Sequence, residues 1–419
     1  MNLAQLFVTE QFGILFNMTL TFRSTLTGFF GGCRSATIAG GLTRYIQVTG
    51  GTPNATEDNM TSVVSDDGKI RWMYLRTSTA QSATGTLTIT LRVNGADSSL
   101  ALTLGAGAAA GLYSQTGITV SVVAGDRITL KIVEGSGTSA AITGIGLLYH
   151  GKDPLWSHSR TMVSSTGTGA TLAASSTGYV DFTSGAIQAT ETARQNISPS
   201  ICLIRNLFFT TTTTQPASGS LVVTMRKNEV DTSLTITIAA NSVAGTYSDT
   251  VNTTKKFNPG DRVNLKLVNN ATATSAGTSG KAFYTYDPKR RQRTTLIIGT
   301  NADTVTASST EYTGGADGGV FQAAENGRYA LSAGSGKLRN FYLYSSTAQP
   351  ASGSVVFTYR VNTVDTSLVI TVPANSAAGV YSDTTNSATI AAGDILTIKA
   401  VNNATAASCT TRFAILQTE

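Results

Sequence analysis

Two histidines, His150 and His158, are the residues best suited by type to metal binding or general-base chemistry. Both lie within the stretch YHGKDPLWSHSR. A histidine pair can ligate zinc, and a histidine beside a serine can activate it as a nucleophile. However, neither histidine recurs elsewhere in the chain, and no carboxylate recurs with them. We therefore interpret this stretch as a linker between domains, whose residues are solvated or pack locally.

Three aspartates, Asp97, Asp231 and Asp365, raise the question of calcium binding. Calcium requires about six to eight oxygen ligands from closely placed carboxylates and carbonyls. Each aspartate is followed downstream by an aspartate at position 126, 261 or 394, but turn formation accounts for these residues better than calcium binding does. The sequence also lacks a nucleophile elbow, a phosphate-binding loop and a zinc-protease motif. It therefore predicts a protein that is not an enzyme and that needs no metal or cofactor.

A basic run, DPKRRQRT, supplies Lys289, Arg290, Arg291 and Arg293. Such a run can bind phosphates, but it has no interleaved aromatic residues and no counterpart in the histidine-containing stretch. The net charge of +6 over 419 residues is only a weak positive bias. We therefore expect no nucleic-acid partner. We interpret the four residues as a contact with an acidic protein neighbour or as a solvated linker.

The sequence contains a repeat with an interval of 134 residues. Asp97, Asp231 and Asp365 follow one another at this interval, and so do the Gly-x-Tyr-Ser motifs that begin at Gly111, Gly245 and Gly379. The interval is too long for a solenoid unit of roughly 20–50 residues. It matches an independently folding domain, whose commonest size is about 100–150 residues. The sequence therefore predicts tandem duplication of a whole domain.

Within each repeat the sequence indicates short antiparallel strands. The segment GSVVFTYRVN (353–362) alternates apolar and polar residues, and the next strand follows the turn NTVD. Such period-2 runs with turn signals every 8–12 residues or so are typical of a β-sandwich. We predict an all-β protein of three tandem antiparallel β-sandwich (jelly-roll) domains with an N-terminal apolar arm. The expected boundaries are 1–33 for the arm and 34–150, 151–287 and 288–419 for the domains.

The repeated text RVNTVDTSLVITVPANSAAGVYSDTTNS resembles β-sandwich modules of phage and other viral particle proteins. It is also similar to the trimer-forming jelly rolls of the tumour-necrosis-factor/C1q type. The likeness covers roughly the second half of each repeat, and the first repeat departs from it with GAGAAAGLYS. The resemblance implies a structural virion protein, such as a capsid decoration, minor capsid or fibre component that bridges neighbouring subunits. It further implies synthesis in the host cytoplasm and a place on the particle surface.

Residues 1–33 have no repeat counterpart, and they are rich in apolar side chains. We expect this arm to anchor the chain to other virion proteins of the capsid or tail through Phe12, Phe16 and Phe22. The alternative for the arm is that it folds back on the first domain. Its apolar run is broken, so we expect no membrane span and no signal peptide. Assembly into a homo-oligomer, including a trimer, is expected from the jelly-roll likeness.

An adhesin of a phage tail, binding a host receptor or glycan, is the alternative function. Sugar binding usually uses exposed aromatic platforms, whereas the loops here are rich in Gly, Ser, Thr and Ala, and the only tryptophans are Trp72 and Trp156. The three cysteines, Cys33, Cys202 and Cys409, are odd in number and widely spaced. We therefore expect isolated thiols that form no disulfide with one another.

Overall fold

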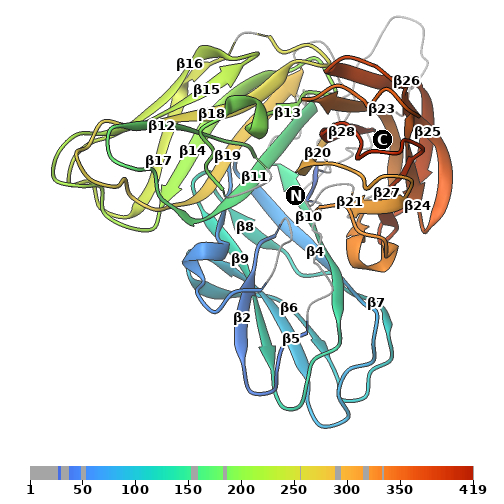
Figure 1. Ribbon diagram of the computed structural model, residues 1–419. Coiled ribbons are helices and arrows are strands. Elements are labelled where there is room, and N and C mark those ends of the chain that lie inside the picture. The colour runs from blue at the N-terminus through green and yellow to red at the C-terminus, as the bar shows by residue number, and fades with distance from the viewer. Residues whose placement is uncertain are drawn as a thin grey trace, which may run out of the picture.

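The protein is built almost entirely from antiparallel strands, which confirms the all-β class. In the computed structural model 54% of the residues are in strands and 3% are helical. The structure describes residues 27–29, 37–48, 53–151, 159–182, 186–254, 256–287, 294–314, 320–332 and 335–418. The strands form six sheets, which combine in pairs into three units that follow one another along the chain (Figure 1).

Unit 1 contains two five-stranded sheets. One has the order β1-β10-β4-β7 with β8 beside β4, and the other has the order β2-β9-β5-β6 with β3 beside β9. A short 3-10 helix, η1 (Asp58–Met60), precedes β3. The strands are β1 (Thr27–Phe29), β2 (Thr43–Ile46), β3 (Ser62–Val63), β4 (Gly68–Thr77), β5 (Leu87–Val93), β6 (Ala96–Leu104), β7 (Gly111–Gln115), β8 (Val120–Val122), β9 (Arg127–Glu134) and β10 (Ile142–Gly151).

Unit 2 repeats this plan with the sheets β11-β19-β14-β17 and β12-β18-β15-β16, the second of which also includes β13. The 3-10 helix η2 (Glu191–Arg194) takes the place of η1. The strands are β11 (Ser159–Ala170), β12 (Ser176–Val180), β13 (Asn196–Ile197), β14 (Leu203–Thr211), β15 (Leu221–Lys227), β16 (Val230–Ile238), β17 (Gly245–Thr253), β18 (Arg262–Asn269) and β19 (Thr278–Asp287).

Unit 3 has the sheets β20-β28-β23-β26 and β21-β27-β24-β25, with β22 beside β27 and η3 (Glu325–Arg328) before β22. Its strand order is therefore that of unit 2. The strands are β20 (Thr294–Asp303), β21 (Thr310–Gly314), β22 (Ala330–Leu331), β23 (Gly336–Ser345), β24 (Val355–Val361), β25 (Val364–Val372), β26 (Gly379–Ile390), β27 (Ile395–Asn402) and β28 (Thr411–Thr418).

Alternation of side chains places one hydrophobic core between the two sheets of each unit. In β16, for example, Leu234, Ile236 and Ile238 are buried, whereas Thr235 and Thr237 between them are exposed. Successive side chains of a strand point to opposite faces, so these three meet the core that includes Phe209. Separate cores of the same kind fill unit 1 and unit 3. Burial of apolar surface is therefore what holds each sheet pair together.

The hairpin turn that the sequence predicted within each repeat is present, and it is fastened to a second turn. Between β15 and β16, Asn228 and Glu229 have φ angles of 48° and 67°, in the left-handed region that Asn tolerates well. The Asn228 amide donates to Asp261 Oδ1 (2.7 Å), and Asn228 Oδ1 accepts from the backbone N–H of Arg262 (2.8 Å). Asp261 belongs to a second turn, Gly260-Asp261, in which Gly260 has φ 88°; the Gly-Asp pair recurs at 125–126 and 393–394. The same Asn–Asp pairing recurs in units 1 and 3.

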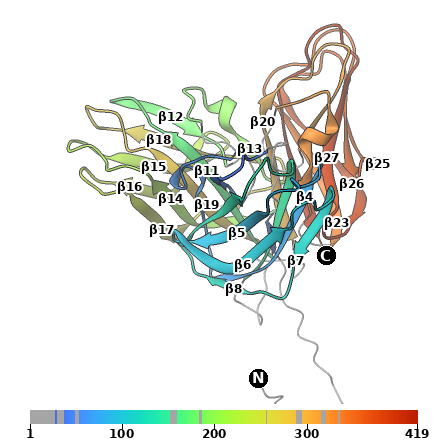
Figure 2. The same ribbon diagram turned by 90° about the horizontal axis from the view of Figure 1, so that it is seen from below.

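The three units lie around a common centre, and each contacts the other two (Figure 1, Figure 2). Their first strands, β1, β11 and β20, touch one another there. Each first strand also pairs with the last strand of its own unit, for instance Thr27 with Tyr149 and Thr161 with Thr285.

Strand β1 lies within residues 1–33, which the sequence predicted to be an arm outside the repeat. Because β1 pairs with β10, Thr27–Phe29 belong to unit 1, and they are the counterpart of β11 and β20. The predicted boundary at residue 33 therefore falls too late. A strand of three residues is too short to show a periodicity in the sequence, so the pairing partner decides its role.

Candidate functional site

Most of the residues that the sequence singled out for function lie outside the part of the chain that the structure describes. This holds for the arm residues Phe12, Phe16 and Phe22, for His158, and for the basic run. The run consists of Lys289, Arg290, Arg291 and Arg293. His150 lies near the end of β10, where its backbone pairs with Lys69. The proposed contacts of these residues therefore remain predictions.

Within the described residues, no group of three or more His, Cys, Asp or Glu side chains is placed to hold a metal ion. None of the described helices combines the length and the apolar character that a membrane span requires. The described cysteines, Cys202 and Cys409, are buried in the separate cores of unit 2 and unit 3 and form no disulfide with each other.

The repeated aspartates belong to a charged network on one sheet of each unit. In unit 2, Arg226 donates from Nε to Glu191 (2.7 Å) and from Nη1 to Asp231, and Lys266 also donates to Asp231. The guanidinium of Arg226 lies 5.9 Å from the ring centroid of Tyr179. Burial works against the charge on Asp231, but hydrogen bonds from Lys266 and Arg226 outweigh it and lower the pKa of Asp231.

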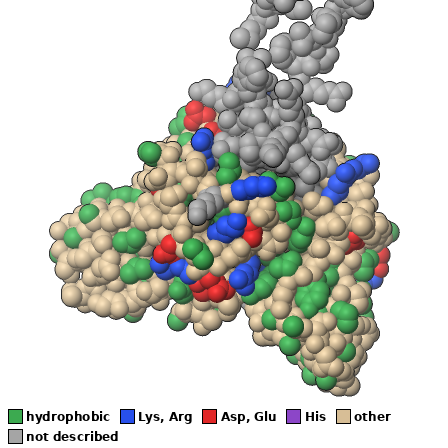
Figure 3. Space-filling model, turned by 90° about the horizontal axis from the view of Figure 1, so that it is seen from above, with side chains coloured by type: hydrophobic (Ala, Val, Ile, Leu, Met, Phe, Trp, Pro, Cys, Tyr) green, Lys and Arg blue, Asp and Glu red, His purple; other side chains and the backbone are tan. Residues whose placement is uncertain are grey.

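Units 1 and 3 carry the same network. Arg92 pairs with Glu57 and Asp97 in unit 1, and Arg360 pairs with Glu325 and Asp365 in unit 3. Lys131 and Lys399 complete the two networks. Figure 3 shows basic and acidic side chains next to each other on the face that it displays. The sequence predicted only a turn at Asp97, Asp231 and Asp365. It missed the network because the glutamate lies 35 residues from the arginine, so only the sheet brings them together.

In units 2 and 3 a buried aspartate links the edge strands of the two sheets. Asp249 lies at a bulge of β17, where its Oδ2 accepts the backbone N–H of Thr235 on the facing strand β16 (3.0 Å). Asp383 does the same for the N–H of Val369 in unit 3 (3.0 Å). Burial opposes the charge of Asp249, but hydrogen bonds from Asn252 and Thr235 outweigh it and lower its pKa. These carboxylates are engaged in holding two sheet edges together.

The junction between units 1 and 2 is apolar at its centre. Phe208 of β14 is buried against Val63 and partly buried Ala124 of unit 1. A ring carbon of Phe208 lies 3.5 Å from the position that a Cβ would occupy on Gly125. Asn206, at a bulge with φ 53°, donates its amide to the backbone carbonyl of Ser65 (3.3 Å). The left-handed conformation turns this side chain out of the sheet pattern and toward the neighbouring unit.

The junction between units 2 and 3 uses the same positions one repeat later. Ile197 of β13 is buried with Tyr342, Tyr344 and Ala414 of unit 3. Asn340, again at a bulge and with φ 52°, donates to the carbonyl of Pro199 (3.3 Å). In addition, Arg262 donates from Nη1 to the Tyr344 hydroxyl (3.1 Å) and lies 5.2 Å from that ring's centroid.

The junction between units 3 and 1 closes the ring without a covalent link. A Cβ built on Gly144 of β10 would lie 2.8 Å from Leu331 Cγ, and one built on Gly393 would lie 2.7 Å from a methyl of Leu112. The Arg76 guanidinium lies 5.8 Å from the ring centroid of Tyr329. The close backbone approach at Gly144 therefore depends on the absence of a side chain.

Unit 1 departs from the repeat at the position that Asn206 and Asn340 occupy in units 2 and 3. Trp72 stands there, 134 residues before Asn206. A left-handed backbone is rare for a bulky aromatic residue, and Trp72 is not among the residues with positive φ in the described part of the chain. Trp72 carries no side-chain amide, so this position cannot donate the amide-to-carbonyl bond that Asn206 and Asn340 make.

Comparison with known proteins adds no family to these observations. No protein-family model matches the sequence, and a search of curated proteins found no significant match. The likeness to viral β-sandwich modules therefore remains an expectation from the repeated text. The described contacts are paired charges, apolar junctions between units and hydrogen bonds between sheet edges, all within one chain.

Proposed function

We propose that the chain is a structural virion protein in which three jelly-roll domains form a trimer-like ring within one polypeptide. The observation that carries this proposal is that the same Gly-Asp turn of each unit meets the next unit around the ring. Gly260 lies against Val380 and Gly393 against Leu112, which occupy the same repeat position, and Gly125 lies against Phe208. Unrelated domains joined in a string would not reuse one position three times.

The strand order of each unit supports the jelly-roll interpretation. Each unit has eight main strands in two four-stranded rows, and the first strand lies beside the last, as β11 lies beside β19. Two packed sheets with such crossing connections are the architecture of jelly rolls in capsid proteins. The charged network in each unit is internally paired, which favours a rigid scaffold over catalysis.

In this proposal the ring presents the domains on the particle surface and bridges neighbouring subunits. The arm residues Phe12, Phe16 and Phe22 would provide the attachment to other capsid or tail proteins. The central contacts of a trimer are made inside one chain by β1, β11 and β20, so the proposed arrangement does not require further trimerisation of whole chains.

The test separates attachment from folding. A chain that lacks residues 1–26 keeps β1, so we expect it to fold like the full chain but to be absent from purified particles. A triple substitution of Phe12, Phe16 and Phe22 by Ser should give the same result. Negative-stain imaging with an antibody against the chain provides the readout. Particles from producing cells that carry none of the full-length chain would refute the virion role, whereas equal incorporation of the truncated chain would refute only the anchor.

A further inference from the structure

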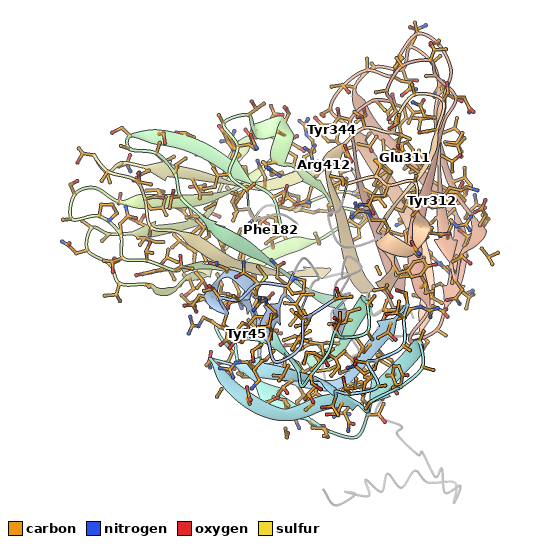
Figure 4. All side chains as sticks on the ribbon, turned by 60° about the horizontal axis from the view of Figure 1, so that its bottom comes forward. Tyr45, Phe182, Glu311, Tyr312, Tyr344 and Arg412 are labelled. Carbon is orange, nitrogen blue, oxygen red and sulfur yellow. The ribbon has the colours of Figure 1, made fainter. Side chains whose placement is uncertain are left out.

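The second junction contains buried charges that the repeat does not account for. Arg412 of β28 pairs across strands with Tyr344, and its counterpart in unit 1 is Gly144, which pairs with Arg76. Lys281 of β19 pairs with Phe209, and its counterparts are Ile145 and Phe413. Two positions that are small or apolar elsewhere are therefore cationic beside this junction. Figure 4 shows Arg412 and Tyr344 where units 2 and 3 meet.

The guanidinium of Arg412 has unused hydrogen-bonding capacity. Its side chain is 0% exposed, and within the described residues its Nε, Nη1 and Nη2 atoms are buried without a hydrogen-bond partner. Buried polar groups are nearly always hydrogen-bonded, and a buried unpaired charge is strongly destabilising. Burial lowers the pKa of Arg412 to about 10, although the charge of Asp181 opposes this. The guanidinium is therefore still cationic at neutral pH.

Charged side chains of unit 2 lie near Arg412 and act on it electrostatically. Arg194 of η2 donates to Asp181 Oδ2 (3.3 Å), and Lys281 donates from Nζ to the Asp181 backbone carbonyl (3.0 Å). Asp181 and Arg194 both act electrostatically on Arg412 and on Lys281. Burial lowers the pKa of Lys281 to about 8, so it too is largely protonated at pH 7.

We propose that this junction is a binding site for a small inorganic oxyanion of the sulfate or phosphate class, with the Arg412 guanidinium as its principal ligand. A guanidinium presents its N–H donors in a planar fork that matches an oxyanion, whereas a halide engages it less fully. Because Arg412 is fully buried, the anion is enclosed as units 2 and 3 pack together, and it stabilises their contact. This role is independent of where the protein is displayed.

The direct test uses selenate, whose selenium atom can be located by anomalous diffraction. The full chain is unfolded in urea, refolded in selenate without sulfate or phosphate, and crystallised. We expect a selenium peak within hydrogen-bonding reach of the Arg412 guanidinium. A refolded protein whose crystals show no selenium at Arg412 would overturn the proposal, because the guanidinium would then be buried without an anion.

A second test measures stability in solution. Protein refolded without oxyanions should gain at least about 3 °C in melting temperature with saturating sulfate, relative to chloride at equal ionic strength. Arg412→Met should lose the saturable part of this gain, whereas Arg44→Met should retain it, because among the described residues the Arg44 guanidinium hydrogen-bonds only to the carbonyl of Thr43. Equal gains in the wild type and Arg412→Met would contradict the proposal. If Arg412→Met does not fold, the selenate experiment on the wild type decides.

Discussion

The contact between Gly144 and Leu331 gives the most direct test of ring closure, because the two residues lie in units 1 and 3 and no linker joins those units. A Cβ on Gly144 would lie 2.8 Å from Leu331 Cγ and 3.2 Å from its Cδ1, and Leu331 is 0% exposed. Such distances require the leucine to move within a filled space. Overpacking of this kind costs about 1–3 kcal/mol, of which the lower entropy of the unfolded alanine chain offsets about 0.4–1 kcal/mol. We therefore expect Gly144→Ala to destabilise the junction by about 1–2 kcal/mol.

A double-mutant cycle isolates this contact from other effects. Leu331→Ala alone should cost about 2–5 kcal/mol, because it removes buried methyl groups. In that background Gly144→Ala should cost nothing or stabilise slightly, since the clashing atoms are gone. The coupling between the two substitutions should therefore be at least about 1 kcal/mol. Gly105→Ala is the matched control, because no atom lies within 4 Å of the added methyl.

Amide hydrogen exchange over β10 and β22 reads out the local opening free energy of the junction. The reasoning predicts faster exchange in both strands for Gly144→Ala and no change for Gly105→Ala. If the effects of Gly144→Ala and Leu331→Ala add within about 0.5 kcal/mol, the two residues do not touch, and the ring is not closed in the way described.

Three further outcomes are expected. Asp249→Asn should cost about 1–3 kcal/mol. Because hydrogen bonds lower the Asp249 pKa below its ordinary value of 3.8, this contribution is complete above the pKa of the unfolded chain and is lost as pH falls through the folded pKa. The difference in melting temperature between the wild type and Asp249→Asn should therefore be smaller at pH 3 than at pH 7, and an equal difference at the two pH values would contradict this account. Asn206→Gly and Asn340→Gly keep the left-handed backbone but remove the donor to the neighbouring unit, and each should cost about 0.5–1.5 kcal/mol in urea unfolding; a neutral result would mean that these bonds do not hold the junctions. Electrophoresis with and without reductant should give the same band, since Cys202 and Cys409 are buried in different cores, and a shifted band would reveal a crosslink.

Much of each unit could be predicted from the sequence because the determining forces are local. Alternating apolar residues define a strand with one buried face, and β16 has the burial pattern that its text predicts. The hairpin turn at Asn362 is equally readable, since Asn tolerates the left-handed conformation observed there, with φ 50°. Because of the 134-residue interval, the strands and turns predicted for one repeat are expected at the equivalent positions of the other two. No partner from elsewhere in the chain is needed for these inferences.

The tertiary structure alone decided which residues meet across the units. Gly144 and Leu331 are unremarkable in the sequence, and their roles follow from an approach of two backbones that only the ring brings about. Arg412 and Lys281 show this most clearly. A charged residue in a strand predicts a solvent-exposed face, yet both side chains are 0% exposed. Their burial results from the packing of unit 3 on unit 2 and from the closing of unit 2 on itself. Local alternation fixes the face on which a side chain lies, but the partner that covers that face is a non-local property.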